Sequence, residues 1–457
     1  MDIEKLLLQP ESKTLEFKRD LSSLDPILKT IVAFANTAGG TIIVGFSEEK
    51  GLLRIEDIFK AEEKIASAIA DSIYPFILPE IKISSVQGKH LLVIQVAHWK
   101  GPFYLKKLGT PNGIYAKLGS TSRPADATFI AEMQRQVVYR HFDEEPLIDL
   151  SLDSLDLEKA KRLFKQENKD LDENKLQNLG ICVSSANRIV PSIGGLILFG
   201  KESPLRQFLP DARVSCARFK GEDKTYFIDR YEVKGTIVDA VDEVLKFIGR
   251  NTRLAAEIQT MRRRDIEEYP TVALREALIN ALAHCDYSIP GSHIQIAIFS
   301  DRLEIQNPGM LPLGFTLENF KSGGSRIRNR VIARVFSELT FMEEWGSGYK
   351  RILSACHADG YPEPIWQELG TFFRVTFYPH TQTVLETPPH KEPLTARQKS
   401  LLQVLGLNKP IPFREILEKT PFILSERTLR YELTELKKLG FLTTQGKGRG
   451  IVWVRVQ

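Results

Sequence analysis

Apolar and polar residues alternate along the first 141 positions with the spacings of short helices and strands. Apolar positions three and four apart predict an amphipathic helix over residues 26–37, and the β-branched run at 41–46 predicts a strand after a glycine turn. We therefore expect residues 1–141 to form a mixed α/β domain. Two further strands and a hairpin-like piece are predicted at residues 80–85, 90–97 and 103–118.

The middle of the chain, residues 178–380, shows the pattern of a second α/β domain. Apolar residues repeat at helical spacing over 271–286, which predicts a helix with one buried face. Two short apolar runs at 294–299 and 302–306, separated by a serine and an aspartate, predict a β-hairpin. The charge-rich residues 142–177, which precede this domain, are predicted to form a helical connector.

The last part of the chain is a third domain. Residues 381–394 contain Thr, Pro and His without periodicity, which is typical of a linker. Residues 395–457 predict three helices, the third with leucines at helical spacing, followed by two strands around a glycine-rich basic tip. Three helices and a two-stranded wing make a winged helix-turn-helix. The overall fold class is therefore α/β (α+β) multidomain.

Composition narrows the class of protein further. The chain has 457 residues, of which 42% are hydrophobic and 26% charged, so two to four soluble domains are expected. No apolar run approaches the roughly 20 residues that a membrane span needs, and no signal-type segment follows the start. The four cysteines lie far apart, without a disulfide or zinc spacing. We expect a cytoplasmic protein without a membrane partner.

Charge is distributed unevenly along the chain. The net charge is +4, but residues 395–457 contain twelve Lys or Arg against five Glu, a balance of +7, which leaves −3 for the remainder. A basic module on a nearly neutral body indicates a polyanionic partner for that module.

Within the middle domain, one predicted helix carries a polar stripe. Glu276, Asn280 and His284 follow one another at i, i+4 and i+8, away from the apolar face. A carboxylate and an amide so placed suit an ATP site: Glu276 would be the base that orients water, and the Asn280 carbonyl oxygen would ligate Mg²⁺. The alternative is an ordinary surface pair at i, i+4.

Glycine motifs follow this helix in an order that also suits a nucleotide. A strand ends in Asn307-Pro-Gly309, a basic glycine-rich run at 321–329 resembles a lid over phosphates, and a late Gly-Ser-Gly opens a helix, whose N-terminus favours anions. No phosphate loop of the G-x-x-x-x-G-K-[ST] kind occurs in the chain. The residues predicted to bind ATP and Mg²⁺ are Asn280, His284, Asn307, Gly309, Gly323, Gly324, Gly346 and Gly348.

The third helix of the C-terminal domain is predicted to bind DNA. Placed in the major groove, it would present its first residues to base edges, while the basic tip of the wing contacts phosphates. The alternative is that this module mediates protein contacts or oligomerisation. The predicted DNA-binding residues are Arg427, Thr428, Arg430, Tyr431, Lys447 and Arg449.

The first domain resembles the Schlafen AlbA-type domain. The resemblance rests on E-S-K-T-L-E-F-K at 11–18, A-F-A-N-T-A-G-G at 33–40, I-V-G-F at 43–46, G-P-F-Y at 101–104 and Y-A-K-L-G-S-T-S-R at 115–123. It implies a nucleic-acid-binding α/β domain, with metal-dependent RNA cleavage in some members. We expect phosphate contacts from Lys18, Lys117 and Arg123.

For the nuclease alternative, the resemblance implies three metal-binding acids. Glu11 and Glu16 match the first two. Where the third is expected, this chain has Ser47 followed by Glu48. The alternative for Glu16 is a local ion pair with Lys18.

The middle domain resembles the divergent GHKL ATPase-like domain, which is found after AlbA-type domains in chains often labelled RecG-like helicases. The resemblance covers roughly residues 193–379. Ordinary GHKL enzymes have an aspartate that reads the adenine amino group, and here Asn307 takes its place. The chain lacks a phosphate loop and tandem motor domains, so the sequence does not support a helicase.

These observations predict an ATP-binding, DNA-binding regulator, such as a transcriptional regulator, whose nucleotide site modulates nucleic-acid binding. Weak ATP hydrolysis, RNA as a second partner and a homo-oligomer are left open by the sequence. The alternative is a Schlafen-like metal-dependent ribonuclease in stress or phage defence, which is the less favoured activity. A third hypothesis is an ATPase that remodels protein complexes.

Overall fold

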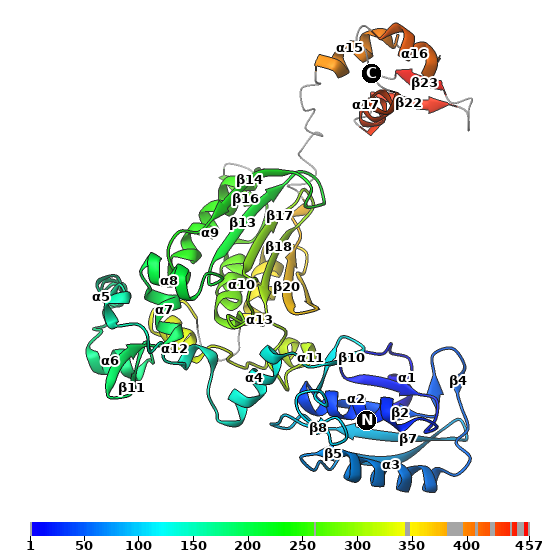
Figure 1. The fold of residues 1–457 in the computed structure, drawn as a ribbon. Helices are drawn as coiled ribbons and strands as arrows, with labels where there is room; N and C mark the ends of the chain where they lie inside the picture. The colour runs from blue at the N-terminus through cyan, green and yellow to red at the C-terminus, as the bar shows by residue number, and fades with distance from the viewer. Residues whose placement is uncertain are drawn as a thin grey trace. The chain divides into compact units, whose positions relative to one another are not determined.

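The structure is a computed structural model that describes residues 2–259, 262–342, 348–381, 396–406, 410–420, 426–438, 441–445 and 452–455. The chain divides into two compact units, Met1–Thr383 and Val384–Gln457 (Figure 1). Both units mix helices with β-sheets, which confirms the predicted α+β class. The part of the chain described contains no helix with the length and apolarity that crossing a membrane requires.

A four-stranded sheet forms the centre of the first domain. Its order is β1 (Leu15–Lys18), β2 (Gly40–Val44), β7 (Lys89–Val96) and β6 (Glu80–Val86), with β1 and β2 parallel and the other pairs antiparallel. Side chains alternate across the sheet. Ile42 and Val44 therefore pack with the core that includes α2 (Leu24–Asn36) and α3 (Ile58–Ser72), while Ile43 belongs to a separate cluster that includes α1. The strands predicted at 80–85 and 90–97 are confirmed.

The remaining elements of this domain are short. They are α1 (Ile3–Leu7), β3 (Phe46–Ser47), β4 (Gly51–Leu52), β5 (Ile73–Tyr74), β8 (Tyr104–Leu105), β9 (Tyr115–Leu118), β10 (Thr121–Pro124) and α4 (Ala127–Val137).

The hairpin predicted over residues 103–118 is wrong. Strand β8 pairs with β5, and β9 pairs with β10 instead. The reason is the buried side chain of Asn36, which donates to the carbonyl oxygens of Phe103 at 2.9 Å and Tyr115 at 3.0 Å and accepts from the Phe103 N–H at 2.8 Å. These bonds occupy backbone groups that a ladder between the two segments would use.

A six-stranded sheet forms the centre of the middle domain. Its order is β14 (Phe227–Glu232), β13 (Val214–Phe219), β17 (Ile294–Ile298), β18 (Leu303–Pro308), β20 (Phe372–Phe377) and β19 (Ile365–Leu369). Only the β13–β17 pair is parallel. Figure 1 shows α9 (Ile237–Asn251), α10 (Thr271–His284) and α13 (Gly348–Ala358) along this sheet. The predicted 271–286 helix and the 294–306 hairpin are both confirmed.

Residues 142–177 are less helical than predicted. They contain two single 3₁₀ turns, η1 (Phe142–Glu144) and η2 (Leu152–Ser154), and two helices, α5 (Leu157–Gln166) and α6 (Glu173–Asn178). Leu155, Ala160 and Phe164 belong to the same buried core as the six-stranded sheet. The segment is therefore packed into the middle domain and is not a free connector.

Asp143 explains why the segment is fixed there. Its buried carboxylate accepts backbone N–H groups of Arg330, Val331 and Ile332 at the start of α12 (Arg330–Glu338), at 2.6 to 3.1 Å. These are donors that a helix start leaves unpaired. Burial raises the pKa of Asp143 to about 7, although the three N–H donors oppose that shift.

The middle domain also contains several other elements. They are β11 (Cys182–Ser185), β12 (Arg188–Pro191), α7 (Ile193–Phe199), α8 (Glu202–Phe208), β15 (Leu254–Gln259), β16 (Arg262–Glu267) and α11 (Leu317–Lys321).

In its described residues, the second unit contains three helices around a small leucine-rich core. The helices are α15 (Ala396–Val404), α16 (Phe413–Lys419) and α17 (Glu426–Lys438), and Leu429, Leu433 and Leu436 of α17 are buried as their spacing predicts. Strands β22 (Leu442–Gln445) and β23 (Val452–Arg455) are antiparallel, and β21 (Pro410–Pro412), which the sequence did not indicate, pairs with β23.

Candidate functional site

The polar stripe on α10 faces the first turn of α13. Asn280 donates from Nδ2 to Oε1 of Glu276 at 3.2 Å, and Arg351 of α13 lies 3.3 Å from the same oxygen. The opposite side of α10 is buried against the sheet through its leucines and alanines. Glu276 is therefore engaged in an ion pair, and Asn280 lines the cavity described below.

Gly348 allows the two helices to approach this closely. A Cβ atom at Gly348 would lie 2.7 Å from Oε1 of Glu276 and 2.8 Å from Nδ2 of Asn280. A side chain at this position would therefore displace the ends of the Glu276 and Asn280 side chains. Gly346, the other glycine predicted here, lies outside the described residues.

The end of β18 brings a second amide to the same place. Asn307 is buried and donates from Nδ2 to the Pro308 carbonyl at 3.2 Å, which leaves its Oδ1 as an acceptor. Gly309 follows with φ +101°, and a Cβ there would lie 2.7 Å from Cβ of Asp286. A left-handed conformation and a close neighbour both require glycine.

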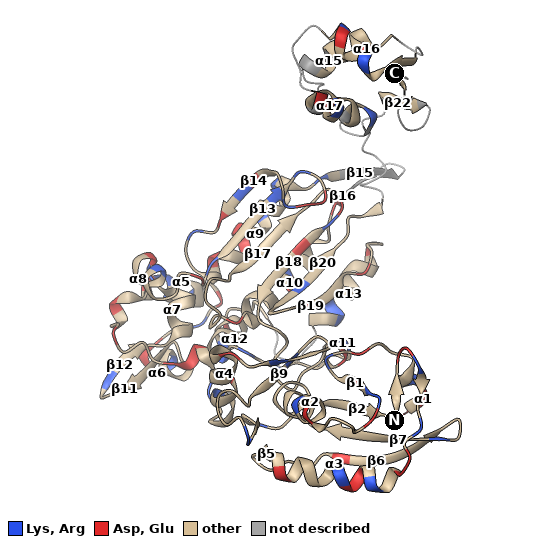
Figure 2. Ribbon diagram, turned by 45° about the vertical axis from the view of Figure 1, so that its right-hand side comes forward, with Lys and Arg blue, Asp and Glu red and all other residues tan. Residues whose placement is uncertain are grey.

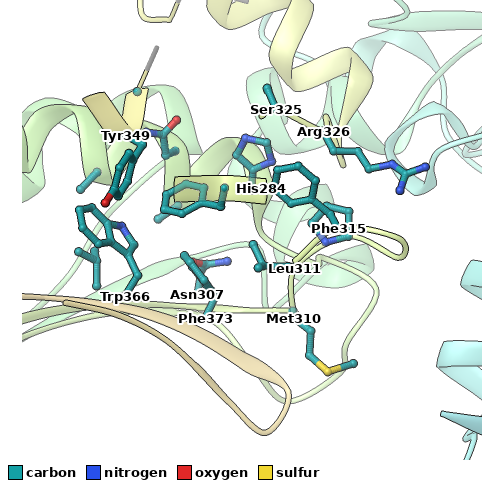
Figure 3. Close-up of a pocket in the computed structure, with 18 of the residues that line it drawn as sticks. His284, Asn307, Met310, Leu311, Phe315, Ser325, Arg326, Tyr349, Trp366 and Phe373 are labelled. Atoms are coloured by element: carbon teal, nitrogen blue, oxygen red, sulfur yellow. The ribbon is translucent and has the colours of Figure 1, made fainter. Parts of the chain in front are cut away.

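These elements enclose a cavity of about 100 Å³ (Figure 3). Aromatic rings form much of its wall. The Phe320 ring lies 5.2 Å from Tyr349, 5.7 Å from Trp366 and 5.8 Å from Phe373, centroid to centroid. An apolar, aromatic wall with a few fixed polar groups is typical of small-molecule sites.

His284 adds a neutral polar group to the cavity. Burial lowers the pKa of its imidazole to about 4, and the nearby positive charge of Arg328 acts in the same direction. At neutral pH it can donate or accept a hydrogen bond but carries no charge.

Most of the predicted nucleotide residues come together here. Glu276 lies beside the cavity through its bond to Asn280, and Gly323 does not line it. The aromatic wall was not predicted, although part of it neighbours the glycine motifs in sequence. The predicted residues that line the cavity are Asn280, His284, Asn307, Gly309, Gly324 and Gly348.

In the first domain, Glu16 is held by two lysines. Its carboxylate pairs with Lys18 and with Lys117, and the Lys117 ammonium also donates to the Ser120 carbonyl at 2.6 Å. The ion pair with Lys18 that the sequence offered as an alternative is therefore present. Lys117 is fully buried, so its predicted contact with phosphates is wrong. Arg123, on β10, is exposed.

The other acids of the nuclease alternative do not join Glu16 in a metal site. Oε1 of Glu11 accepts the Phe17 N–H at 2.8 Å, and Oε1 of Glu48 accepts the Glu11 N–H at 3.3 Å. Throughout the described ranges, no group of three or more His, Cys, Asp or Glu residues is placed to hold a metal ion. The geometry gives the nuclease reading no support.

The structure describes only some of the residues that are predicted to bind DNA. Tyr431 is 61% exposed, and Arg430 lies 3.6 Å from Glu426 and 4.9 Å from the Phe413 ring. Thr428 is partly buried. The Arg427 side chain, Lys447 and Arg449 lie outside the described residues, and the prediction for α17 stays a prediction. Figure 2 marks the lysine and arginine positions along the ribbon.

Two segments of the chain match known families. Residues 11–126 match the family described as Schlafen, AlbA_2, and residues 291–377 match the family described as "Putative ATP-dependent DNA helicase recG C-terminal". The chain therefore contains both domains, as the sequence motifs predicted.

Solved structures with some similarity include the DIP2311 protein from Corynebacterium diphtheriae. It is 20% identical, the match covers 99% of this chain and 96% of that chain, and the TM-score is 0.44. Another is the N-terminal domain of a putative ATP-dependent DNA helicase RecG-related protein from Nitrosomonas europaea. It is 28% identical over 27% of this chain and 90% of that chain, with a TM-score of 0.23. No curated protein matches the chain.

Proposed function

We propose that this chain, with its Schlafen AlbA_2 and RecG C-terminal-type domains, is an ATP-binding and DNA-binding regulatory protein. Nucleotide binding in the cavity beside α10 modulates nucleic-acid binding by the first domain and by the C-terminal module. The observation that carries the proposal is the convergence of Asn280, Asn307 and Gly348, from three separate elements, on one aromatic-walled cavity.

The polar groups of the cavity suit the parts of Mg-ATP. The free Oδ1 of Asn307 can accept a hydrogen bond from the amino group of adenine, as an aspartate would. Asn280 has its nitrogen engaged by Glu276, so its oxygen is available to Mg²⁺, which prefers oxygen ligands. Mg²⁺ would neutralise phosphate charge beside the start of α13. The aromatic wall provides a surface for the base.

The size of the cavity supports a role in modulation. At about 100 Å³ it is smaller than the roughly 300 Å³ of ordinary ligand pockets, so a nucleotide requires its wall to move. Residues 310–326 form the outer wall, and they are attached to the first domain. The Gly314 N–H donates to the Thr37 carbonyl at 2.6 Å, and Glu368 accepts both the Leu311 N–H and the Lys13 ammonium at 2.8 Å. Ligand entry would therefore change contacts with the first domain.

ATP hydrolysis is expected to be slow. Glu276, the predicted base, is paired with Arg351 and hydrogen-bonded to Asn280. A carboxylate fixed in this way must break a pair before it can take a proton from water. A binding site of this kind acts as a switch through ordering of its wall, without fast turnover.

Isothermal titration calorimetry with the full chain tests the nucleotide site. We expect Asn280→Ala to weaken Mg-ATP binding about ten-fold or more while leaving adenosine binding unchanged, because its oxygen would contact only the metal. Asn307→Ala should weaken the binding of both ligands, because it would contact the base. Asn178→Ala, at an exposed position on α6, is the matched control.

Equal Mg-ATP affinity in the wild type, Asn280→Ala and Asn307→Ala would refute the nucleotide assignment. A chain that binds Mg-ATP but shows the same DNA affinity with and without it would refute the modulation and leave the site intact.

A further inference from the structure

A second cavity, of about 410 Å³, lies where the end of α4 meets residues 325–330. Its wall is strongly basic. It contains five cationic side chains, from Lys100, Arg140, Arg326, Arg328 and Arg330, against one carboxylate, from Glu132. Such a concentration of positive charge attracts anions.

The one carboxylate does not neutralise this wall. Glu132 is bound by Arg135 at 2.9 Å, which lies outside the cavity lining. Neither Arg140 nor Arg326 forms an ion pair with any residue in the part of the chain that the structure describes. Arg330 pairs with Glu144 at 3.6 Å and Arg328 with Asp286 at 2.9 Å, yet the buried Nε of Arg328 has no hydrogen-bond partner within the described ranges. The cavity therefore keeps unused positive charge and donors.

Tyr139 stands at the rim of this cavity in an unusual conformation. Its φ is +57°, a left-handed value that bulky residues rarely adopt, and its side chain is 71% exposed. The Lys100 ammonium lies 3.4 Å from the ring centroid. The backbone thus holds an aromatic ring in solvent, with a cation over the ring.

We propose that this cavity binds the phosphate backbone of a single-stranded nucleic acid, with one base stacked on Tyr139. Exposed rings beside cations are the usual platform for unpaired bases, whereas a paired base in a duplex offers no free face. The site gives a location and a ligand class to the nucleic-acid binding of the proposed function and rests on that part of it, but it requires no bound ATP.

The basic cavity also adjoins the nucleotide cavity. Pro312, Ser325 and Arg326 line both. Phosphate could therefore arrive from a nucleic-acid strand or from a nucleotide that extends out of the neighbouring cavity. The exposed ring of Tyr139 favours the strand, and the experiment separates the two sources.

Fluorescence anisotropy with a fluorescein-labelled twelve-nucleotide oligothymidylate tests the proposal in the full chain. All variants carry Arg430→Ala and Tyr431→Ala, which reduce any contribution of α17. We expect Arg140→Gln to weaken binding about five-fold at 0.1 M salt, since each lost phosphate contact changes the salt slope by about 0.7 for a single strand. Tyr139→Asn, which tolerates the left-handed backbone, should weaken it roughly 5- to 100-fold.

Lys246→Gln is the matched control, since this lysine on α9 is 70% exposed and lies outside the cavity lining. Unchanged oligothymidylate affinity and salt slope in both Arg140→Gln and Tyr139→Asn would overturn the proposal. So would a loss of Mg-ATP affinity in Arg140→Gln with normal oligothymidylate binding, because the phosphates would then be those of the nucleotide. A chain that binds no ATP but shows the expected oligothymidylate losses would refute the ATP site of the proposed function and support this site.

Discussion

The buried ion pair between Lys117 and Glu16 allows an experiment to distinguish a structural role of Glu16 from a metal-binding role. If Glu16 were a metal ligand, neutralising it would leave folding unaffected and would abolish metal-dependent cleavage. In the structure it joins β1 to β9 through Lys117, whose side chain is fully buried. We therefore expect Lys117→Met and Glu16→Gln to destabilise the first domain.

The magnitude follows from what each substitution leaves behind. Lys117→Met leaves the Glu16 carboxylate in a nearly dry site with only Lys18, whose side chain is 24% exposed, and it removes the donor to the Ser120 carbonyl. Breaking a buried pair in this way costs about 3–5 kcal/mol. We expect the lower end, about 3 kcal/mol, because Lys18 remains. The double variant should cost less than the sum of the single variants by at least about 1 kcal/mol, because it removes both buried charges and leaves only the partly exposed Lys18 without its partner.

Urea unfolding measures these free energies, and hydrogen exchange in peptides that cover β1 and β9 localises the effect. Lys82→Met is the control, since its pair with Glu80 is more than half exposed on both sides and should matter by less than about 0.5 kcal/mol. Losses below about 0.5 kcal/mol in both Lys117→Met and Glu16→Gln would refute the reasoning. Cleavage of RNA with Mn²⁺ that disappears in Glu16→Gln would restore the nuclease alternative.

Two further predictions concern stability. Asn36→Ala removes three buried hydrogen bonds, each contributing about 1 kcal/mol, so urea unfolding should show a loss of about 3 kcal/mol, whereas the exposed Asn178→Ala should show almost none. The folded-state pKa of His284, about 4, lies below its unfolded value of 6.5, so the unfolded chain binds the extra proton first as pH falls. Stability should therefore decline from pH 6.5 towards 4 and be unaffected by this group above 6.5. His284→Gln should flatten that decline in melts recorded across the range, and an identical acid profile in wild type and variant would contradict the assignment.

Periodicity predicted the parts of the candidate nucleotide site that local sequence determines. The apolar repeat placed α10 correctly, and its polar stripe put Asn280 where the structure has it. The hairpin β17–β18 placed Asn307 at a strand end. Each of these positions depends on residues within about one turn or one strand of it, which is why a single sequence suffices to find them.

The sequence could not reveal contacts between residues that lie far apart in the chain. In β9 the usual pattern is inverted, since Lys117 is buried while Leu118 is 37% exposed. Lys117 is inside because Glu16, 101 positions earlier, provides its counter-charge. Asp143 likewise looked like one charge in a polar connector, but it caps a helix that begins 187 residues later. Residue propensities alone favour an exposed lysine and an unpacked connector. Tertiary partners override both expectations.

The wall formed by residues 310–326 gives the proposed regulation a physical route. Leu311 and Pro312 face the nucleotide cavity, while Leu313 is buried in a cluster with Ile114 and Met133 of the first domain. Adjacent residues of a short segment cannot move independently, so a nucleotide that displaces the first two residues must disturb the third. Coupling between two ligands is reciprocal. Under the proposed coupling, a nucleic acid that fixes the first domain, or that holds Arg326 in the basic cavity, changes the affinity for the nucleotide by the same factor by which the nucleotide changes the affinity for that nucleic acid.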